Sequence, residues 1–299
     1  MQLDLFAHSR DVMLRNDLAT ALTQRDAATS RSALAQWACE YPEDPGLAAA
    51  RLLVAALVQA AESPPRPPPG STLAAARAYQ RSVLAPAAAA MLGSKDAQSW
   101  LKPLWRSLAL QHAHVPWDPA LPDQHAAPLW LAAADWAQAE QAAAGIASWR
   151  RIPVPLAWIS EARYRLAGPA GLDLIWPLLA ELAWLAPPRL ATLLQTLSDP
   201  LLDRLRTRFE EQSELLDQAT DPVQALAWFP AWVLTDKPAL AALLAPAQAG
   251  QNTPPEQGLR LLVQLLHLER QGRHHDLMAR RKALRDLCLP LYQAYMATR

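Results

Sequence analysis

One short run of the chain combines tryptophan, glutamate and arginine at a spacing that suits the binding of a peptide. In PLAWISEARYRLAG, Trp158, Glu161, Ala162 and Arg165 recur every three or four residues, so a helix would place them in one stripe. Tryptophan and arginine are enriched where protein partners bind. Because this stripe mixes an aromatic ring with charges, we expect Trp158 to be exposed on a binding face. The alternative is that tryptophans fill the space between alanine-lined helices.

Three nearby residues extend this candidate partner-binding set, namely Trp136, Arg150 and Arg151. The two arginines stand just before Pro153, which cannot continue a preceding helix. Their guanidinium groups could bind a carboxylate of a partner. They could instead complement the negative end of a helix dipole, and the sequence leaves both interpretations open.

A basic patch near the end of the chain forms a second set of candidates, made of Arg273, Arg280, Arg281, Lys282 and Arg285. Such a patch could bind phosphates of a nucleic acid or an acidic segment of a partner protein. Asp276 and Asp286 interrupt it, and no aromatic residue interleaves with it before Tyr292. A solvated helix face is the alternative.

No motif for catalysis or for cofactor binding is present in the sequence. There is no Gly-x-Ser-x-Gly, no phosphate-binding loop and no dinucleotide fingerprint. The histidines of 112–125 and of 267–275 have no carboxylate or cysteine spaced to complete a zinc site. Cys39 and Cys288 each lie in an apolar helical pattern, so we expect two free, buried thiols. The sequence predicts a non-enzymatic protein without a metal ion or cofactor.

The elements that position these residues are expected to be helices. Hydrophobic residues make up 52% of the 299 residues, and alanine, the best helix former, supplies much of that share. Only 9 glycines and 3 phenylalanines are present, and β-branched residues are sparse, which disfavours a β-sheet protein. The composition therefore predicts an all-α fold.

The charge balance and the apolar segments bear on partners and location. The 28 basic and 28 acidic residues cancel, so no global field attracts nucleic acid or an anionic membrane. The N-terminal run 1–14 is not a secretory signal. Charges and prolines interrupt the most apolar stretch, 171–194, so we expect no membrane insertion. The composition resembles that of a GC-rich bacterial genome, and we expect a cytoplasmic protein.

A polar turn, an alanine- or leucine-rich run and a closing proline recur along the chain, at Asp26–Pro42, Asp135–Pro153, Gly168–Pro187 and Gly272–Pro290. Each of these runs is preceded by another helical run, so the pattern is helix, tight turn, helix and proline stop. A second set of prolines recurs at steps of 33 to 35 residues, at Pro86, Pro119, Pro153, Pro187, Pro222 and Pro255. A period near 34 is typical of a repeated helical hairpin.

The first of these runs, QRDAATSRSALAQWACEYPEDP, resembles the second half of a tetratricopeptide repeat. Asp26, Ser30 and Pro42 fit the spacing of that family, whereas Ala27 stands where an aromatic residue is usual. In the next run Trp136 supplies that aromatic residue, although the predicted helix to the closing proline is two residues longer than in the family. The resemblance implies a right-handed superhelix with a concave groove that binds peptide segments of partners.

Three parts of the chain are expected from these patterns. Residues 1–61 would form an N-terminal helical hairpin unit, 62–72 a proline-rich linker, and 73–299 a helical-repeat array. Another irregular stretch, 245–258, precedes a helix that Thr253 can cap, with two prolines in its opening positions.

The sequence thus predicts an all-α protein, an irregular α-solenoid of antiparallel helix hairpins similar to a tetratricopeptide superhelix. The expected function is that of a non-catalytic scaffold or adaptor that binds a peptide or helix of a partner protein in a bacterial cytoplasmic assembly. The alternative is binding of nucleic acid or of an acidic partner through the basic C-terminal helices, with nucleic acid disfavoured by the balanced charge. An enzyme with an unrecognised site is a third hypothesis, and the sequence leaves homo-oligomerisation open.

Overall fold

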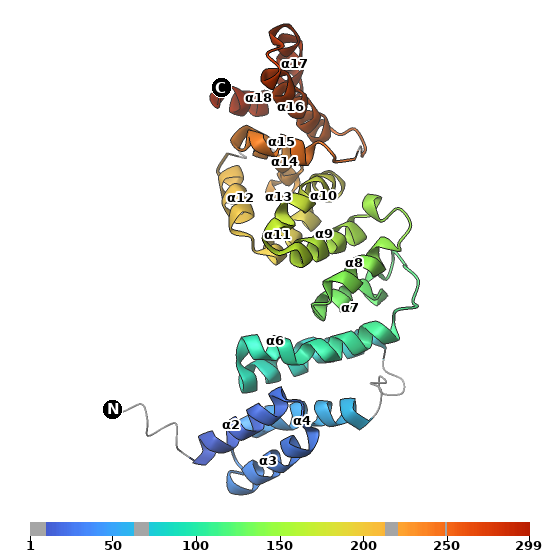
Figure 1. The fold of residues 1–299 in the computed structure, drawn as a ribbon, viewed down its shortest axis with the longest axis vertical. Coiled ribbons are helices and arrows are strands. Elements are labelled where there is room, and N and C mark those ends of the chain that lie inside the picture. The colour runs from blue at the N-terminus through green and yellow to red at the C-terminus, as the bar shows by residue number, and fades with distance from the viewer. Residues whose placement is uncertain (1–9, 63–71, 213–220, 249) are drawn as a thin grey trace, which may run out of the picture. The chain divides into compact units, whose positions relative to one another are not determined.

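The structure of the chain is a computed structural model that describes residues 10–62, 72–212, 221–248 and 250–299 (Figure 1). Every regular element within these ranges is a helix, and none of these residues forms a strand. The prediction of an all-α protein is therefore confirmed.

The chain divides into two compact units, Met1–Asp135 and Trp136–Arg299. The division lies further along the chain than the proline-rich segment 62–72, whose residues 63–71 lie outside the described ranges. The segment lies between α4 (Gly46–Glu62) and α5 (Leu73–Tyr79), and α4 packs on the following long helix α6 (Ala85–Gln111) within the first unit. The division between the two units therefore does not fall at this segment.

The first unit contains the helices α2 (Arg10–Thr23), α3 (Ala27–Glu40), α4 (Gly46–Glu62), α5 (Leu73–Tyr79), α6 (Ala85–Gln111) and α7 (Ala127–Ala132). Successive helices pack in order, α2 on α3 and α3 on α4, and α6 then contacts both α4 and α2. A short π-helix, Gln80–Leu84, joins α5 to α6. Gly93 interrupts α6 with a φ of 77°, a conformation that glycine adopts without strain.

The turn between α2 and α3 follows the prediction from the sequence. Asp26 stands at the N-cap of α3, and its carboxylate accepts the backbone N–H groups of Ala28 and Thr29, both at 3.0 Å. Ser30, the small residue of the repeat pattern, is fully buried. Trp37 is also fully buried, so this tryptophan belongs to the core of the first unit.

The second unit contains a longer series of helices, which are α8 (Trp136–Ala144), α9 (Pro153–Ala167), α10 (Gly171–Leu185), α11 (Pro187–Leu197), α12 (Pro200–Gln212), α13 (Pro222–Ala225), α14 (Phe229–Asp236), α15 (Ala241–Leu244), α16 (Pro254–Arg270), α17 (His274–Leu287) and α18 (Leu289–Ala297). Proline is the first residue of α9, α11, α12, α13 and α16. These prolines lack the N–H group that would be unsatisfied at a helix start and have a suitable φ, so they begin helices as the sequence indicates.

One predicted helix is wrong in length. The run from Asp135 to Pro153 was expected to be helical throughout, but α8 ends at Ala144. Gly145 follows in a turn, and a 3-10 turn, Trp149–Arg151, leads into α9. Glycine is a poor helix former, and the turn at this residue divides the run into a helix and a connection.

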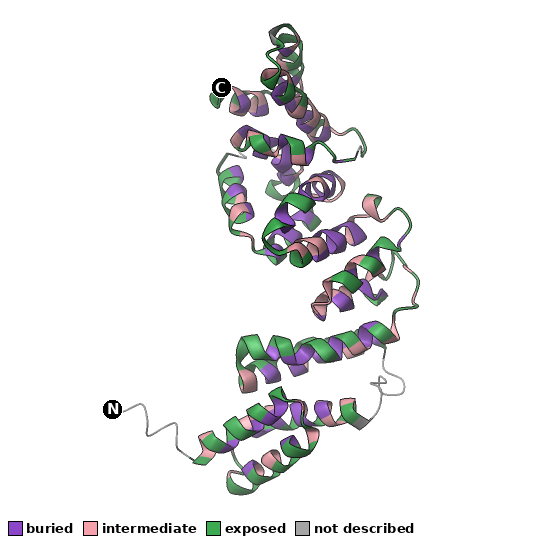
Figure 2. Ribbon diagram, in the orientation of Figure 1, coloured by how far each residue is buried: buried purple, intermediate pink, exposed green. Residues whose placement is uncertain are grey.

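Helix α10 is the centre of the second unit. It packs on α9, α11, α14 and α15, and Ile175, Trp176, Leu179 and Leu182 on it are all at most 1% exposed. Figure 2 shows the contrast with α17, most of whose residues are exposed. The hairpins α9–α10 and α16–α17 pack as expected, and α14 additionally contacts α18. The second unit therefore combines helix hairpins with contacts between helices that are not consecutive.

The stretch Pro153–Leu185 is long and apolar enough to cross a membrane when only length and composition are considered. It consists of α9 and α10, which are separated by a 3-10 turn at Gly168–Ala170 and pack on each other. More than half of its most apolar window, 56%, is buried inside the structure. A buried core helix meets the same criteria, so this stretch is weak evidence for a membrane span.

The two cysteines are both free. Cys288 is partly buried, and burial raises the pKa of its thiol although the backbone N–H of Leu291 acts against this. Cys39 lies on the exposed side of α3. The expectation that both thiols are buried is therefore wrong for Cys39, because only one side of that amphipathic helix is covered.

Candidate partner-binding cleft

Trp158 does not lie on an open face of α9. Its side chain is only 9% exposed, and Leu156 and Ile159 on other sides of the same helix are fully buried. Helix α9 packs against α8, α10 and α11, so neighbouring helices cover Trp158 as well as Leu156 and Ile159. The prediction that Trp158 is exposed is therefore wrong, and this tryptophan is a core residue.

The other members of the predicted stripe remain partly accessible. Glu161 is half-buried, and burial raises the pKa of its carboxyl although the positive charge of Arg165 lowers it. Arg165 is exposed and donates to the carbonyl oxygen of Thr196 in α11 at 2.7 Å. Trp136 is half-buried at the start of α8. These residues do not form one apolar and charged surface.

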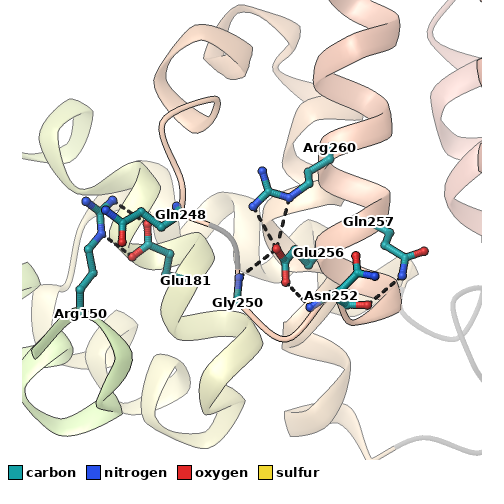
Figure 3. Close-up of polar contacts among 8 residues, drawn as sticks. All are labelled: Arg150, Glu181, Gln248, Gly250, Asn252, Glu256, Gln257 and Arg260. Atoms are coloured by element: carbon teal, nitrogen blue, oxygen red, sulfur yellow. Dashed lines mark hydrogen bonds and ion pairs between the residues drawn. The ribbon is translucent and has the colours of Figure 1, made fainter. Parts of the chain in front are cut away.

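Arg150 is paired inside the protein. It lies in the 3-10 turn before α9, and its Nε and Nη2 atoms donate to the two carboxylate oxygens of Glu181, each at 2.6 Å (Figure 3). Glu181 projects from the central helix α10 and is 4% exposed. It also accepts the backbone N–H of Gln248 at 2.7 Å. One carboxylate therefore connects α9's leading turn, α10 and the segment before α16.

A second buried carboxylate, that of Glu256, also binds the segment before α16. Glu256, in the first turn of α16, accepts the backbone N–H groups of Gly250 at 3.0 Å and Asn252 at 2.9 Å (Figure 3). Its carboxylate also pairs with Arg260 at 2.9 Å. Burial raises the pKa of this carboxyl, but the two N–H groups and the guanidinium outweigh burial and hold the pKa below its usual value.

This arrangement corrects the expected cap of α16. Thr253 does occupy the N-cap position, and prolines fill the first positions of the helix, as predicted. Its hydroxyl makes no capping hydrogen bond. The carboxylate of Glu256 reaches back past the N-cap and accepts the backbone N–H groups of Gly250 and Asn252, whereas the glutamate of a capping box accepts the N–H group of the N-cap residue itself.

A cleft of about 160 Å³ opens beside these two carboxylates, lined by Arg150, Arg151, Glu181, Trp184, Leu185, Gln248, Gly250 and Gln251. Trp184 and Leu185 supply its apolar wall, and the guanidinium of Arg260 lies over the Trp184 ring at 5.8 Å from the centroid. Trp184 also borders a second depression of about 140 Å³. We refer to the first of these as the Arg151 cleft.

Arg151 differs from the other cations around this cleft. Its side chain is exposed and forms no hydrogen bond or ion pair with any residue that the structure describes. Arg150 is neutralised by Glu181, and Arg260 by Glu256. Arg151 therefore provides the charge in the cleft that is available to a ligand.

Sequence reasoning selected Arg150 and Arg151 but missed Glu181 and Gln248. The signal for Glu181 is that it stands alone as a charged residue in the run LIWPLLAELAWL. A carboxylate that is buried with an apolar helix must find a cationic or N–H partner. The identity of that partner, however, depends on contacts between segments far apart in the chain.

The carboxylates of the cleft are not arranged for metal binding or proton transfer. The carboxylate oxygens of Glu181 and Glu256 accept hydrogen bonds from an arginine side chain and from backbone N–H groups. Within the described ranges, no group of three or more His, Cys, Asp or Glu residues lies close enough to hold a metal ion. The cleft places one cation that is unpaired among the described residues, Arg151, beside the apolar side chains of Trp184 and Leu185.

The basic patch lies on and beside α17, and several of its charges are already paired. Arg273 forms an ion pair with Asp276 at 2.5 Å, and Arg281 lies 3.3 Å from Glu269. The other members of the patch, Arg280, Lys282 and Arg285, are exposed. Part of the charge of the patch therefore lies in internal pairs, and the rest is exposed on α17.

The sequence matches no protein-family model, and no curated protein or solved structure matches it.

Proposed function

We propose that the chain is a non-catalytic scaffold or adaptor, and that the Arg151 cleft receives one acidic residue and a neighbouring apolar residue of a partner peptide. The observation that carries the proposal is the exposed guanidinium of Arg151 at the edge of a cleft walled by Trp184 and Leu185. An arginine fork pairs with a carboxylate through two parallel hydrogen bonds.

The size of the cleft supports a peptide over an enclosed small substrate. Pockets for drug-sized ligands are on the order of 300–1,000 Å³, whereas this cleft measures about 160 Å³. That volume suits an anchoring side chain rather than a whole molecule. An extended segment could place one residue here while the rest of it lies on the surface.

The helical hairpins are consistent with a platform for such a segment. The pairs α2–α3, α9–α10 and α16–α17 each pack as consecutive helices within one unit. We infer an irregular α-solenoid, similar to tetratricopeptide arrays, in which stacked hairpins present an extended surface. The contacts of α10 with α14 and α15 are the irregular part of that arrangement. In this proposal the protein acts in the cytoplasm of a bacterium.

The test is a peptide selection on the full-length protein. A display library of random peptides is selected on the parent protein, and the affinities of the selected peptides are measured by fluorescence polarisation. We expect a consensus in which aspartate or glutamate lies next to a bulky apolar residue. The variant Arg151→Glu should weaken binding by about tenfold or more, since a charged hydrogen bond contributes about 1.5–3 kcal/mol.

The matched control is Arg189→Glu, which makes the same change of charge at an exposed residue of α11 that does not line the cleft. It should leave the affinities within about twofold, because an exposed charge away from the contact contributes little. A selection without an acidic consensus, or equal binding to Arg151→Glu, would show that the cleft is not the binding site.

A further inference from the structure

A second surface of the same unit has a different composition. A shallow depression of about 520 Å³ is lined by Met278, Ala279, Arg281, Lys282, Arg285 and Tyr292. The first five of these residues lie on α17 and the last on α18, and the two helices pack on each other. We call it the α17–α18 surface.

The apolar part of this surface is exposed to solvent. The side chain of Met278 is 69% exposed, the largest exposure among the bulky apolar side chains described. Met278, Lys282 and Arg285 are spaced by four and three residues, which puts them on one stripe of the helix. Methionine adapts its shape to an incoming apolar group, and it is enriched at surfaces that bind partner helices. Tyr292, half-buried on α18, forms the opposite edge.

The charged part of the surface is cationic, because its lining contains three basic residues and no carboxylate. Arg281 is fixed by Glu269 and by the hydroxyl of Tyr295. Lys282 is exposed and has no partner among the residues described, and Arg285 lies 3.6 Å from its own neighbour Asp286. Two of the three cations are therefore accessible to an anionic ligand.

We propose that the α17–α18 surface docks an acidic amphipathic helix of a partner protein. The occupant follows from the arrangement, since an apolar strip around Met278 is bordered by Lys282 and Arg285. Such a helix would lay apolar residues on the strip and place glutamates against the two cations. Helix α17 has 14 residues and is about 21 Å long, which gives room for several turns of a docked helix.

The same geometry disfavours a nucleic acid as the occupant. Binding to a phosphate backbone relies on many unpaired cations along its path, and here, within the described lining, only two accessible cations share their stripe with an exposed methionine. Stacking of bases requires open aromatic faces, and the one aromatic residue of the lining, Tyr292, is half-buried. This inference does not depend on the Arg151 cleft, whose residues it does not use.

The test uses defined probes on the full-length protein. The main probe is a fluorescent peptide of about 16 residues, built from leucine, glutamate and alanine with leucines on one helical face, a length at which a helix becomes marginally stable. A second peptide has the same composition with its leucines scattered around the helix. The third probe is single-stranded DNA of equal charge. We expect the amphipathic peptide to bind about tenfold more tightly than either of the others.

Variants locate the binding. The double change Lys282→Glu and Arg285→Glu should lower the affinity for the amphipathic peptide by about tenfold or more. The change Met278→Gln should lower the same affinity by about threefold. The control, Arg189→Glu with Arg204→Glu, alters the net charge equally at exposed residues elsewhere in the unit and should change affinity by less than about twofold. The cleft variant Arg151→Glu should also leave this binding unchanged.

The proposal is overturned if the scattered peptide or the DNA binds as tightly as the amphipathic peptide, because the surface would then be a general polyanion site. It is equally overturned if the Lys282 and Arg285 variant retains full affinity while circular dichroism shows an intact fold. The result of the Arg151→Glu test in the peptide selection has no effect on either of these outcomes, because the two sites share no residue.

Discussion

Replacing Glu181 by glutamine tests whether the pair with Arg150 holds the second unit together. In the parent, the carboxylate accepts two N–H donors of Arg150 at 2.6 Å and the backbone N–H of Gln248 at 2.7 Å. The amide of glutamine retains one oxygen, which can still accept the backbone N–H of Gln248 and one N–H of Arg150, now without a negative charge. The second oxygen is replaced by an NH₂ group that faces the donors of a guanidinium.

The expected loss can be estimated from these contacts. Hydrogen bonds to a charged group contribute about 1.5–3 kcal/mol each and neutral ones about 0.5–1.5 kcal/mol, so weakening two of them costs about 2 kcal/mol. Breaking a fully buried ion pair would cost more. The side chain of Arg150, however, is 27% exposed and can turn toward water. We therefore expect about 2 kcal/mol, or about 4–8 °C in the melting temperature of a unit of this size.

The assay is thermal unfolding of the full-length protein followed by circular dichroism, with hydrogen exchange of the Gln248 amide as a local readout. Arg150→Met should cost less in the Glu181→Gln background than in the parent, because the two residues share one interaction. The control is Glu211→Gln, at an exposed residue of α12, which should shift the melting temperature by less than about 1 °C. A shift that small for Glu181→Gln, or additive effects of the two changes, would refute the reasoning.

Two further predictions concern the same unit. The pKa of Glu256 is depressed in the folded protein, so its stabilising effect is present above the unfolded pKa of about 4.5 and is lost as the pH falls through the lower, folded value. The gap in melting temperature between the parent and Glu256→Gln should therefore narrow as the pH is lowered from about 6 to about 3. In addition, Gly171→Ala should destabilise the unit by about 1–3 kcal/mol in urea unfolding, because its Cβ would lie 2.8 Å from the Cα of Tyr164.

Each of these predictions has a result that contradicts it. A gap that stays constant between the two pH values would mean that the depressed pKa of Glu256 is not coupled to folding. For the glycine, Gly145→Ala is the matched control, since its nearest neighbour would be a carbonyl oxygen at 3.4 Å, an ordinary contact. If Gly171→Ala is as stable as Gly145→Ala, the α9–α10 approach is looser than the structure indicates.

Local features of the fold could be predicted from the sequence because they depend on neighbouring residues. Pro153 and Pro187 begin α9 and α11, and Asp26 caps α3, as the pattern of turns and proline stops indicates. Each of these outcomes is set within a few residues by steric limits on φ or by one side-chain hydrogen bond. The hairpins follow, because short turns leave consecutive helices next to each other.

Burial could not be predicted in the same way. The stripe with Trp158 has the composition of a binding face because charged residues share it, but α8, α10 and α11 pack around α9 and bury Trp158. Helical periodicity identifies the sides of a helix and not how many of them are covered. Arginine pairing has the same difficulty, because Arg150 and Arg151 are adjacent in sequence and only one of them meets Glu181.

The cleft was beyond sequence reasoning because its parts are distant along the chain. Arg150, Glu181 and Gln248 meet only when the turn before α9, the central helix and the segment before α16 are all in place. No spacing rule connects residues that far apart. The isolated carboxylate in an apolar run was visible in the sequence, but the two donors that satisfy it were not.

The two glutamates that grip the segment before α16 also limit how the protein can be divided in the laboratory. A fragment that stopped after α15 would keep Glu181 but lose the backbone donor at Gln248, and one that began at α16 would keep Glu256 but lose Gly250 and Asn252. Either fragment would keep the ion pair of its glutamate with Arg150 or Arg260 but would lose the backbone donors that complete the hydrogen bonding of that carboxylate. Expression clones for the C-terminal half should therefore start ahead of Arg150 and extend through Arg260. A shorter fragment would lose the hydrogen bonds by which Glu181 and Glu256 hold the segment before α16.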